Sequence, residues 1–146
     1  MAIKFVDYKG NIDNEPLELR KIFELMKEDA DGQINVAYFR HRQLVIGGGS
    51  DKKSELELYF GSDRNKKITI VIVKFIKQRQ GNCTRLIDLL LKYGRKEGYE
   101  TLEIQSVQSD EMEAFARKNN FEQEVLHPAL QSFYGKEHTD NWLKNI

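Results

Sequence analysis

The sequence predicts a mixed α/β domain, and three features lead to this prediction. Segments with strand character alternate with amphipathic helical segments along the chain. The run ITIVIV (68–73) is apolar on both faces, as in a central strand. Two strand–helix–strand crossovers follow residue 68, which implies parallel pairing and helices on the sheet faces. Because no repeat, low-complexity tract or linker interrupts the chain, we expect residues 1–146 to form one domain.

The N-terminal third predicts a strand, a helix and an ambiguous segment. Residues 2–8 (AIKFVDY) have strand character. A helix with Pro16 in its first turn then runs to about Glu28 on an apolar stripe. Residues 34–46 fit either a strand or a helical face, with a strand near 43–47.

The middle of the chain predicts a hairpin followed by a long helix. Residues 55–60 (ELELYF) and 68–75 (ITIVIVKF) are strands joined by a polar turn. Residues 84–98 repeat apolar side chains at helical spacing, and Gly98 is a suitable stop.

The C-terminal third predicts three strands and one short helix. Residues 101–107 (TLEIQSV) form a strand, and the helix after it has Ser109 as its N-cap, acidic residues in its first turn and basic residues in its last. Strands are expected at 121–126 and near 131–134.

The composition is that of an ordinary globular protein and excludes several classes. The 146 residues are 40% hydrophobic and 32% charged, which supplies a core and argues against disorder. Basic and acidic residues both number 23, so no net charge attracts nucleic acid or an anionic membrane. We expect neither partner.

The cysteine and hydropathy patterns predict a reducing compartment and no metal site. Cys83 is the only cysteine, so no internal disulfide forms, and its spacing from the histidines fits no zinc motif. The longest apolar run is far shorter than the roughly 20 residues of a membrane span. No targeting segment is visible, and a cytoplasmic location is the expectation.

The junction KQRQGNCTRL, between the apolar strand and its helix, is the most informative segment. A glycine turn at a helix start aims backbone N–H groups and the positive helix end at one point, which suits an anion. Seven basic residues and no acidic one lie between Arg64 and Arg85, which favours a polyphosphate. The competing interpretation is that Gly81 only makes a tight turn and the lysines solvate a hairpin.

This junction resembles the cofactor loop of the GNAT superfamily, the acyl-CoA-dependent N-acetyltransferases. The family pattern is Q/R-x-x-G-x-G/A at the start of a helix, and residues 78–83 read QRQGNC, with Cys83 where glycine or alanine is usual. The element order and the ending KNNF, where the family has K-x-G-F, agree over about residues 55–125. The resemblance implies a GNAT-like α/β fold, with a central mixed, mostly antiparallel sheet, a splayed parallel strand pair and flanking helices.

The resemblance also implies acetyl-CoA as the co-substrate. In the family, the loop amides hold the pyrophosphate, and pantetheine lies along the main chain of the preceding strand. The backbone N–H of Val71 would polarise the thioester carbonyl and stabilise the oxyanion. The implied cofactor-binding residues are Val71, Val73, Phe75, Gln78, Arg79, Gln80, Gly81, Asn82, Cys83, Thr84 and Ser109.

Two positions depart from the family pattern and leave the catalytic acid open. Ser109 stands where many members have asparagine, and Ala116 stands where many have the tyrosine that protonates the leaving thiolate. Tyr134 or Tyr93 could take the acid role, or the thiolate could leave without a dedicated acid.

The general base is equally open. Glu57 is the first candidate, because it alternates with apolar residues on the strand before the cofactor strand, as Glu55 does. Glu103 is a further candidate. A solvated strand face is the competing interpretation of each.

The leading hypothesis is an enzyme that transfers an acetyl group from acetyl-CoA to a small-molecule or peptide amine by direct attack in a ternary complex. The alternative is a non-catalytic GNAT-fold module that binds acyl-CoA or a protein partner. A weaker third hypothesis is nucleotide binding by GGSDKKS (48–54), a near miss to a P-loop. The aromatic residues of the tail, Phe133, Tyr134 and Trp142, predict packing or a homodimer contact.

Overall fold

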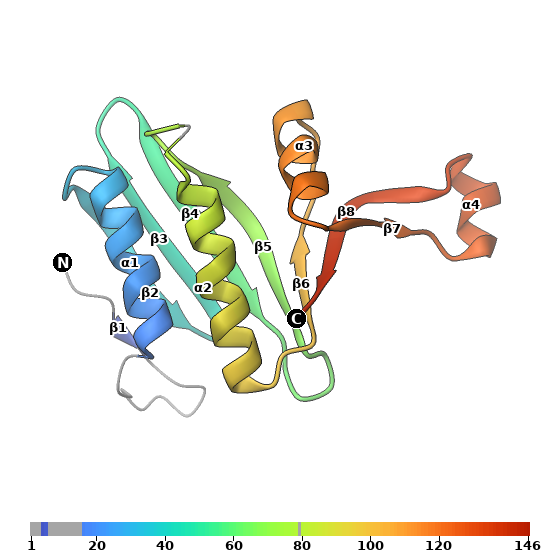
Figure 1. Ribbon diagram of the computed structural model, residues 1–146, viewed down its shortest axis with the longest axis horizontal. Coiled ribbons are helices and arrows are strands. Elements are labelled where there is room, and N and C mark those ends of the chain that lie inside the picture. Colours follow the sequence, from blue (N-terminus) through green and yellow to red (C-terminus); the bar gives the residue numbers. More distant parts are fainter. Residues whose placement is uncertain (1–3, 6–15, 79) are drawn as a thin grey trace.

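The computed structural model describes residues 4–5, 16–78 and 80–146 (Figure 1). The strands are β1 (Lys4–Phe5), β2 (Ile34–Arg40), β3 (Gln43–Gly49), β4 (Lys53–Phe60), β5 (Lys67–Lys74), β6 (Thr101–Ile104), β7 (Glu122–Val125) and β8 (His138–Asn145). The helices are α1 (Leu17–Asp29), α2 (Asn82–Glu97), α3 (Asp110–Lys118) and α4 (Pro128–Tyr134).

The described strands form one mixed sheet in the order β1-β2-β3-β4-β5-β6-β8-β7. Most neighbours are antiparallel, and the parallel pairs are β1–β2 and β5–β6. Pairing of β5 with β6 ends at Ile70 opposite Ile104, although β5 continues to Lys74. The two strands therefore run together at one end and diverge at the other (Figure 1), so the predicted fold class and its splayed parallel pair are confirmed.

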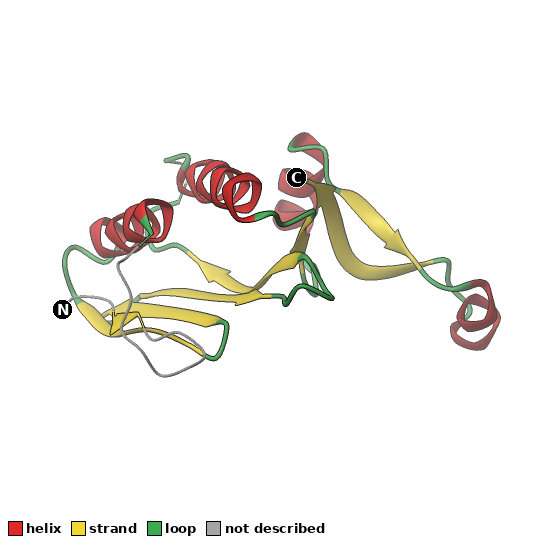
Figure 2. Cartoon of the chain, turned by 90° about the horizontal axis from the view of Figure 1, so that it is seen from below, coloured by secondary structure: helices red, strands yellow, loops and turns green. Residues whose placement is uncertain are grey.

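Helices α1 and α2 cover the same face of the sheet (Figure 2). In α1 the apolar residues recur at helical spacing, and Leu19, Ile22 and Met26 are fully buried. In β4 the side chains alternate between buried and exposed, and Phe60 packs against Tyr93 of α2 with ring centroids 5.4 Å apart. The core is therefore the layer between these helices and the strands β3 to β6.

The ambiguous segment 34–46 folds as a β-hairpin. Strands β2 and β3 are joined at His41 and Arg42, which both have positive φ, as the two central residues of a tight hairpin turn require. Of the strand predicted at residues 2–8, Lys4–Phe5 form β1 and pair with β2, and the rest lies outside the described residues.

The strand predicted near residues 131–134 is wrong, because these residues belong to helix α4. Pro128 occupies the first turn, the His127 side chain accepts a hydrogen bond from the N–H of Ala129 (3.2 Å), and Gly135 ends the helix in the left-handed conformation. Proline at the start and glycine just past the end delimit a helix, so these two residues bound this short segment. The last strand, β8, begins only at His138.

The expectation of parallel pairing across the second crossover, from β6 through α3 to β7, is also wrong. Strands β6 and β7 point the same way, but β8 lies between them and is antiparallel to both. Strands β7 and β8 extend away from the rest of the molecule and carry α4 at their far end (Figure 1). We call residues 122–145 the C-terminal arm. None of the helices in the described ranges is long and apolar enough to span a membrane.

Candidate functional site

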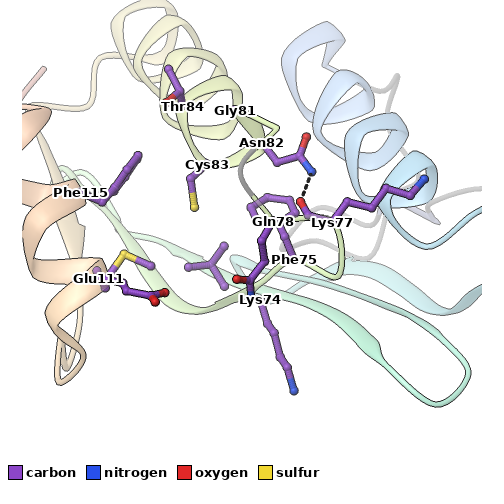
Figure 3. A pocket seen from close by; sticks show the side chains of 12 residues that line it. Lys74, Phe75, Lys77, Gln78, Gly81, Asn82, Cys83, Thr84, Glu111 and Phe115 are labelled. Carbon is purple, nitrogen blue, oxygen red and sulfur yellow. Dashed lines mark hydrogen bonds between the residues drawn. The ribbon is translucent and has the colours of Figure 1, made fainter.

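A cavity of about 560 Å³ lies at the junction between β5 and α2 and is closed on one side by α3 (Figure 3). Met112 and Phe115 of α3 contribute apolar walls, and Glu111 contributes a carboxylate. Most residues predicted to bind the cofactor line this cavity: Val73, Phe75, Gln78, Gly81, Asn82, Cys83 and Thr84.

A second cavity, of about 310 Å³, fills the space where β5 and β6 diverge. Val73 and Met112 line both cavities, so the two adjoin. The second cavity contains Val71 and Ser109, which the sequence also assigned to the cofactor. The Ser109 hydroxyl accepts a hydrogen bond from the N–H of Met112 (3.1 Å), so it caps α3 as predicted.

Val71 lies at an irregularity of the sheet. The register between β4 and β5 passes from Leu58 opposite Ile70 to Glu57 opposite Ile72, which leaves Val71 without a partner on β4. Pairing with β6 has already ended at Ile70. A bulge of this kind changes the direction of the backbone groups, and this one lies where β5 and β6 begin to separate.

The loop before α2 presents backbone N–H groups that bond to no described residue. Gly81 is the N-cap with φ +75°, a left-handed conformation that glycine adopts without strain, and its carbonyl accepts from the N–H of Arg85 (2.9 Å). The N–H groups of Asn82, Cys83 and Thr84 donate to no described residue. A Cβ at Gly81 would meet nothing within 4 Å, so the loop faces open space. This geometry suits an anion.

Hydrogen bonds to the carboxylate of Asp29 hold the loop in place, and the sequence did not identify this residue. Asp29 ends α1 and is 1% exposed. Its carboxylate accepts hydrogen bonds from the N–H of Ile76 (2.7 Å), the N–H of Lys77 (2.8 Å), the side-chain amide of Asn82 (3.3 Å) and the hydroxyl of Ser54. No local pattern could have revealed it, because its partners lie 25 to 53 residues further along the chain.

The run of basic residues does not converge on this loop. Lys66 and Lys67 lie at the other end of β5 and pair with Glu100 (3.9 Å) and Glu103 (3.3 Å). Figure 3 shows the Lys74 side chain pointing away from the loop. The prediction that a concentrated positive field attracts a polyphosphate is therefore wrong for these lysines, because the strand spreads them along its length.

Lys77 lines the cavity, but its ammonium group is held by an ion pair with Asp31. Its ammonium group lies 2.6 Å from the Asp31 carboxylate and donates to the carbonyl of Glu28 (2.9 Å). The hydrogen bond with Asp31 raises the pKa of Lys77. Arg79 lies outside the described residues. Among the residues described, it is backbone amides rather than lysine ammonium groups whose geometry suits an anion here.

Cys83 lines the cavity as a protonated thiol. Burial raises the pKa of Cys83 to about 11, because desolvation penalises the thiolate. A helix N-terminus alone would lower a thiol pKa, so burial is the larger effect here. Cys83 is therefore a small wall residue and a poor nucleophile.

The residues proposed for acid and base roles lie away from both cavities. Glu57 accepts a hydrogen bond from the side-chain amide of Gln43 and lies on the sheet face opposite the buried Leu56 and Leu58. Tyr134 is 59% exposed on α4, at the far end of the C-terminal arm (Figure 1). Neither residue lines either cavity.

The remaining candidates are buried elsewhere. Tyr93 packs against Phe60 in the core, and desolvation there raises its pKa. Ala116 is fully buried, as expected of a packing residue. Glu103 is 4% exposed and bonds to Lys67 and Thr69. Glu111 is the carboxylate that reaches the larger cavity, and the sequence marked it only as a first-turn acid of α3.

The glycine-rich segment GGSDKKS lacks the structural context of a P-loop. It spans the end of β3 and the start of β4, which are antiparallel, whereas a P-loop joins a strand to a helix. A Cβ at Gly48 would lie 2.2 Å from the carbonyl oxygen of Gln33, so close packing accounts for this glycine. The nucleotide-binding hypothesis is therefore set aside.

Solved structures with the same arrangement of elements name the fold. A probable acetyltransferase of the GNAT family from Chromobacterium violaceum matches with a TM-score of 0.50 and 21% sequence identity, over 71% of this chain and 57% of that one. The protein has the GNAT fold. No protein-family model matches the sequence, and no curated protein matches it.

Other structural neighbours of this GNAT-fold chain are more distant. The PaiA N-acetyltransferase of Thermoplasma acidophilum, in complex with coenzyme A, has a TM-score of 0.46 and 15% identity, over 82% of this chain and 65% of that one. An acetyltransferase of Bacillus subtilis, also in complex with CoA, has a TM-score of 0.47 and 17% identity, over 92% and 95%. The chain spans less than two thirds of the length of the first two structures.

The GNAT fold also accounts for the ending KNNF. Asn120 stands where the family has glycine, and it has φ +64°. Asparagine tolerates the left-handed conformation better than other non-glycine residues, so the turn between α3 and β7 is kept.

Proposed function

We propose that the protein binds acetyl-CoA in the two adjoining cavities and transfers the acetyl group to an amine. The observation that carries this proposal is the coincidence of three features at one place: first-turn amides of α2 that bond to no described residue, a bulge at Val71, and a cavity where β5 and β6 diverge. The amides suit the pyrophosphate. The cavity between the strands suits the pantetheine arm, which would lie along Val71, Val73 and Phe75.

The chemistry asked of the protein is modest. The amine attacks the thioester carbon, a C–N bond forms, the C–S bond breaks, and the thiol receives a proton. The N–H of Val71 would bind the carbonyl oxygen and stabilise its charge in the transition state. Positioning of the two substrates side by side supplies much of the remaining rate enhancement.

The second candidate is a non-catalytic module that binds acyl-CoA. It is favoured by one observation: Tyr134 and Glu57, the residues proposed as acid and base, both lie outside the cavities, and Ala116 has no hydroxyl. Both candidates share the CoA site and differ only in turnover.

Thermal shift measurements test the shared site first. Acetyl-CoA and CoA, but not ATP, are expected to raise the Tm, because a ligand at about one hundred times its Kd adds roughly 2.7 kcal/mol of stability. No shift with either CoA ligand would overturn both candidates. A subsequent panel of amines, followed by release of the CoA thiol, separates transferase from binding module.

A further inference from the structure

The buried carboxylate of Asp29 has no role in the proposed chemistry and yet accepts hydrogen bonds from four donors in the described part of the chain. Burying a carboxylate costs several kcal/mol unless its oxygens are fully hydrogen-bonded. Here the N–H groups of Ile76 and Lys77, at 2.7 and 2.8 Å, satisfy one oxygen each, and the side chains of Ser54 and Asn82 add to them. This set of hydrogen bonds indicates that Asp29 fixes the conformation of the segments that carry the donors.

The donors lie on both sides of the candidate phosphate-binding loop. Ile76 and Lys77 lead into it, and Asn82 is the first residue of α2, directly after it. The side chain of Asn82 also donates to the carbonyl of Lys77 (3.3 Å; Figure 3), which ties the end of the loop to its start. Asp29 therefore fixes both ends, while Gly81 faces the cavity.

We propose that Asp29 is the positioning residue that shapes this loop for the pyrophosphate of CoA, a proposal that rests on the function proposed above. Asp29 does not line the cavity, and its negative charge would repel a phosphate at contact distance. It acts through the backbone. Its carboxylate accepts hydrogen bonds from the N–H groups of Ile76 and Lys77 on the side away from the cavity, so that the first-turn amides of α2 point toward the cavity. Hydrogen bonds to a carboxylate are about twice as strong as neutral ones, which suits this task.

Asparagine cannot replace this carboxylate. An amide has one oxygen acceptor, and its NH₂ group would face an N–H donor of Ile76 or Lys77. We therefore expect Asp29→Asn to misplace the loop while the strands and helices persist.

The test compares two ligands that differ in the phosphates. CoA contains the pyrophosphate, whereas pantetheine retains only the arm that would lie along β5. Dissociation constants for both are measured by NMR titration of wild type and Asp29→Asn. CoA binding is expected to weaken by on the order of 10- to 100-fold, as when residues that orient metal ligands are removed. Pantetheine binding is expected to stay within about twofold.

Asp31→Asn is the matched control. Asp31 lies two residues after the end of α1, and among the described residues its carboxylate bonds the ammonium group of Lys77 and not the loop backbone. Its φ of +51° is tolerated by asparagine. CoA binding by this variant should match wild type within about twofold.

The outcomes are separable. Failure of the wild type to bind CoA would overturn the proposed function and this inference with it. Wild-type CoA binding with an unaltered Asp29→Asn constant would overturn the inference alone, as would an equal loss for CoA and pantetheine. If Asp29→Asn does not fold, Asn82→Ala removes one of the four donors and is expected to weaken CoA, but not pantetheine, by several-fold.

Discussion

The loop before α2 and the C-terminal arm are held in opposite ways. Segments from α1, β4 and α2 converge on the loop through Asp29, which is 1% exposed. In the arm, α4 buries no residue, and Phe133 is 78% exposed. The candidate cofactor loop is therefore anchored to the core, whereas Tyr134, the residue proposed as catalytic acid, lies on a helix without buried residues. The acid role of Tyr134 stays a prediction, and its position outside both cavities argues against it.

A pair of identical substitutions measures this contrast in stability. Phe60→Ala should lower the free energy of unfolding by about 3–5 kcal/mol, because Phe60 is 1% exposed and touches Phe39, Tyr93 and Tyr99. Phe133→Ala should stay within about 0.5 kcal/mol, since its ring packs chiefly on Tyr134. Urea denaturation checks both. A large loss from Phe133→Ala would mean that the arm is buried in solution.

A second pair separates strain from binding. Gly81 and Gly135 both have left-handed φ, and a Cβ at either would meet nothing within 4 Å. Valine at either position should cost roughly 1–2 kcal/mol of strain. Only Gly81→Val should lose CoA affinity, by roughly 10- to 150-fold, because one hydrogen bond to a charged group contributes about 1.5–3 kcal/mol.

Calorimetric titration with CoA checks this second pair. Gly135→Val serves as the control, since it carries the same strain at the end of α4. Unchanged affinity in Gly81→Val would mean that the loop is a structural turn and not a ligand site.

The sequence revealed the features that local chemistry determines. Proline, glycine and the apolar periodicity located α1, α2 and α3, and Ser109 caps its helix as expected. The loop residues Gly81 and Cys83 line the cavity, and their role in cofactor binding stays a prediction. These features depend on neighbours a few residues away, which is why a single sequence carries them.

Features that depend on residues far apart in the sequence could not be predicted in this way. Asp29 reads as a routine helix-end residue until the fold brings Ile76 and Lys77 to it. The basic run looked concentrated because residues adjacent in sequence were counted together, whereas β5 carries Lys67 and Lys74 to opposite ends of a strand. The sequence does contain residues that predict α4, namely Pro128 at its start and Gly135 after its end, so the strand predicted near residues 131–134 was an avoidable error.

The thiol of Cys83 gives a finer measure of the loop. With a pKa of about 11, its thiolate fraction at pH 8 is about 0.001, so alkylation by iodoacetamide should be roughly 200-fold slower than for a free thiol with a pKa near 8.5. The rate should rise about tenfold per pH unit between pH 8 and 10, because deprotonation limits it. Bound CoA should protect the thiol. Rapid alkylation at pH 8 would show that Cys83 is more exposed to solvent than in this structure.

The smallest expected effect tests the arm directly. Tyr134→Phe removes only a hydroxyl that is remote from both cavities, so CoA affinity and the rate of acetyl transfer, with an amine identified by the panel, should stay within about twofold of wild type. Calorimetry and thiol release measure the two quantities. A tenfold loss of rate with normal CoA affinity would contradict this expectation and restore Tyr134 as the acid. Figure 1 shows α4 far from α2 and β5, and no α4 residue lines either cavity, so that result would require the arm of a second copy, and sedimentation would then have to show a dimer.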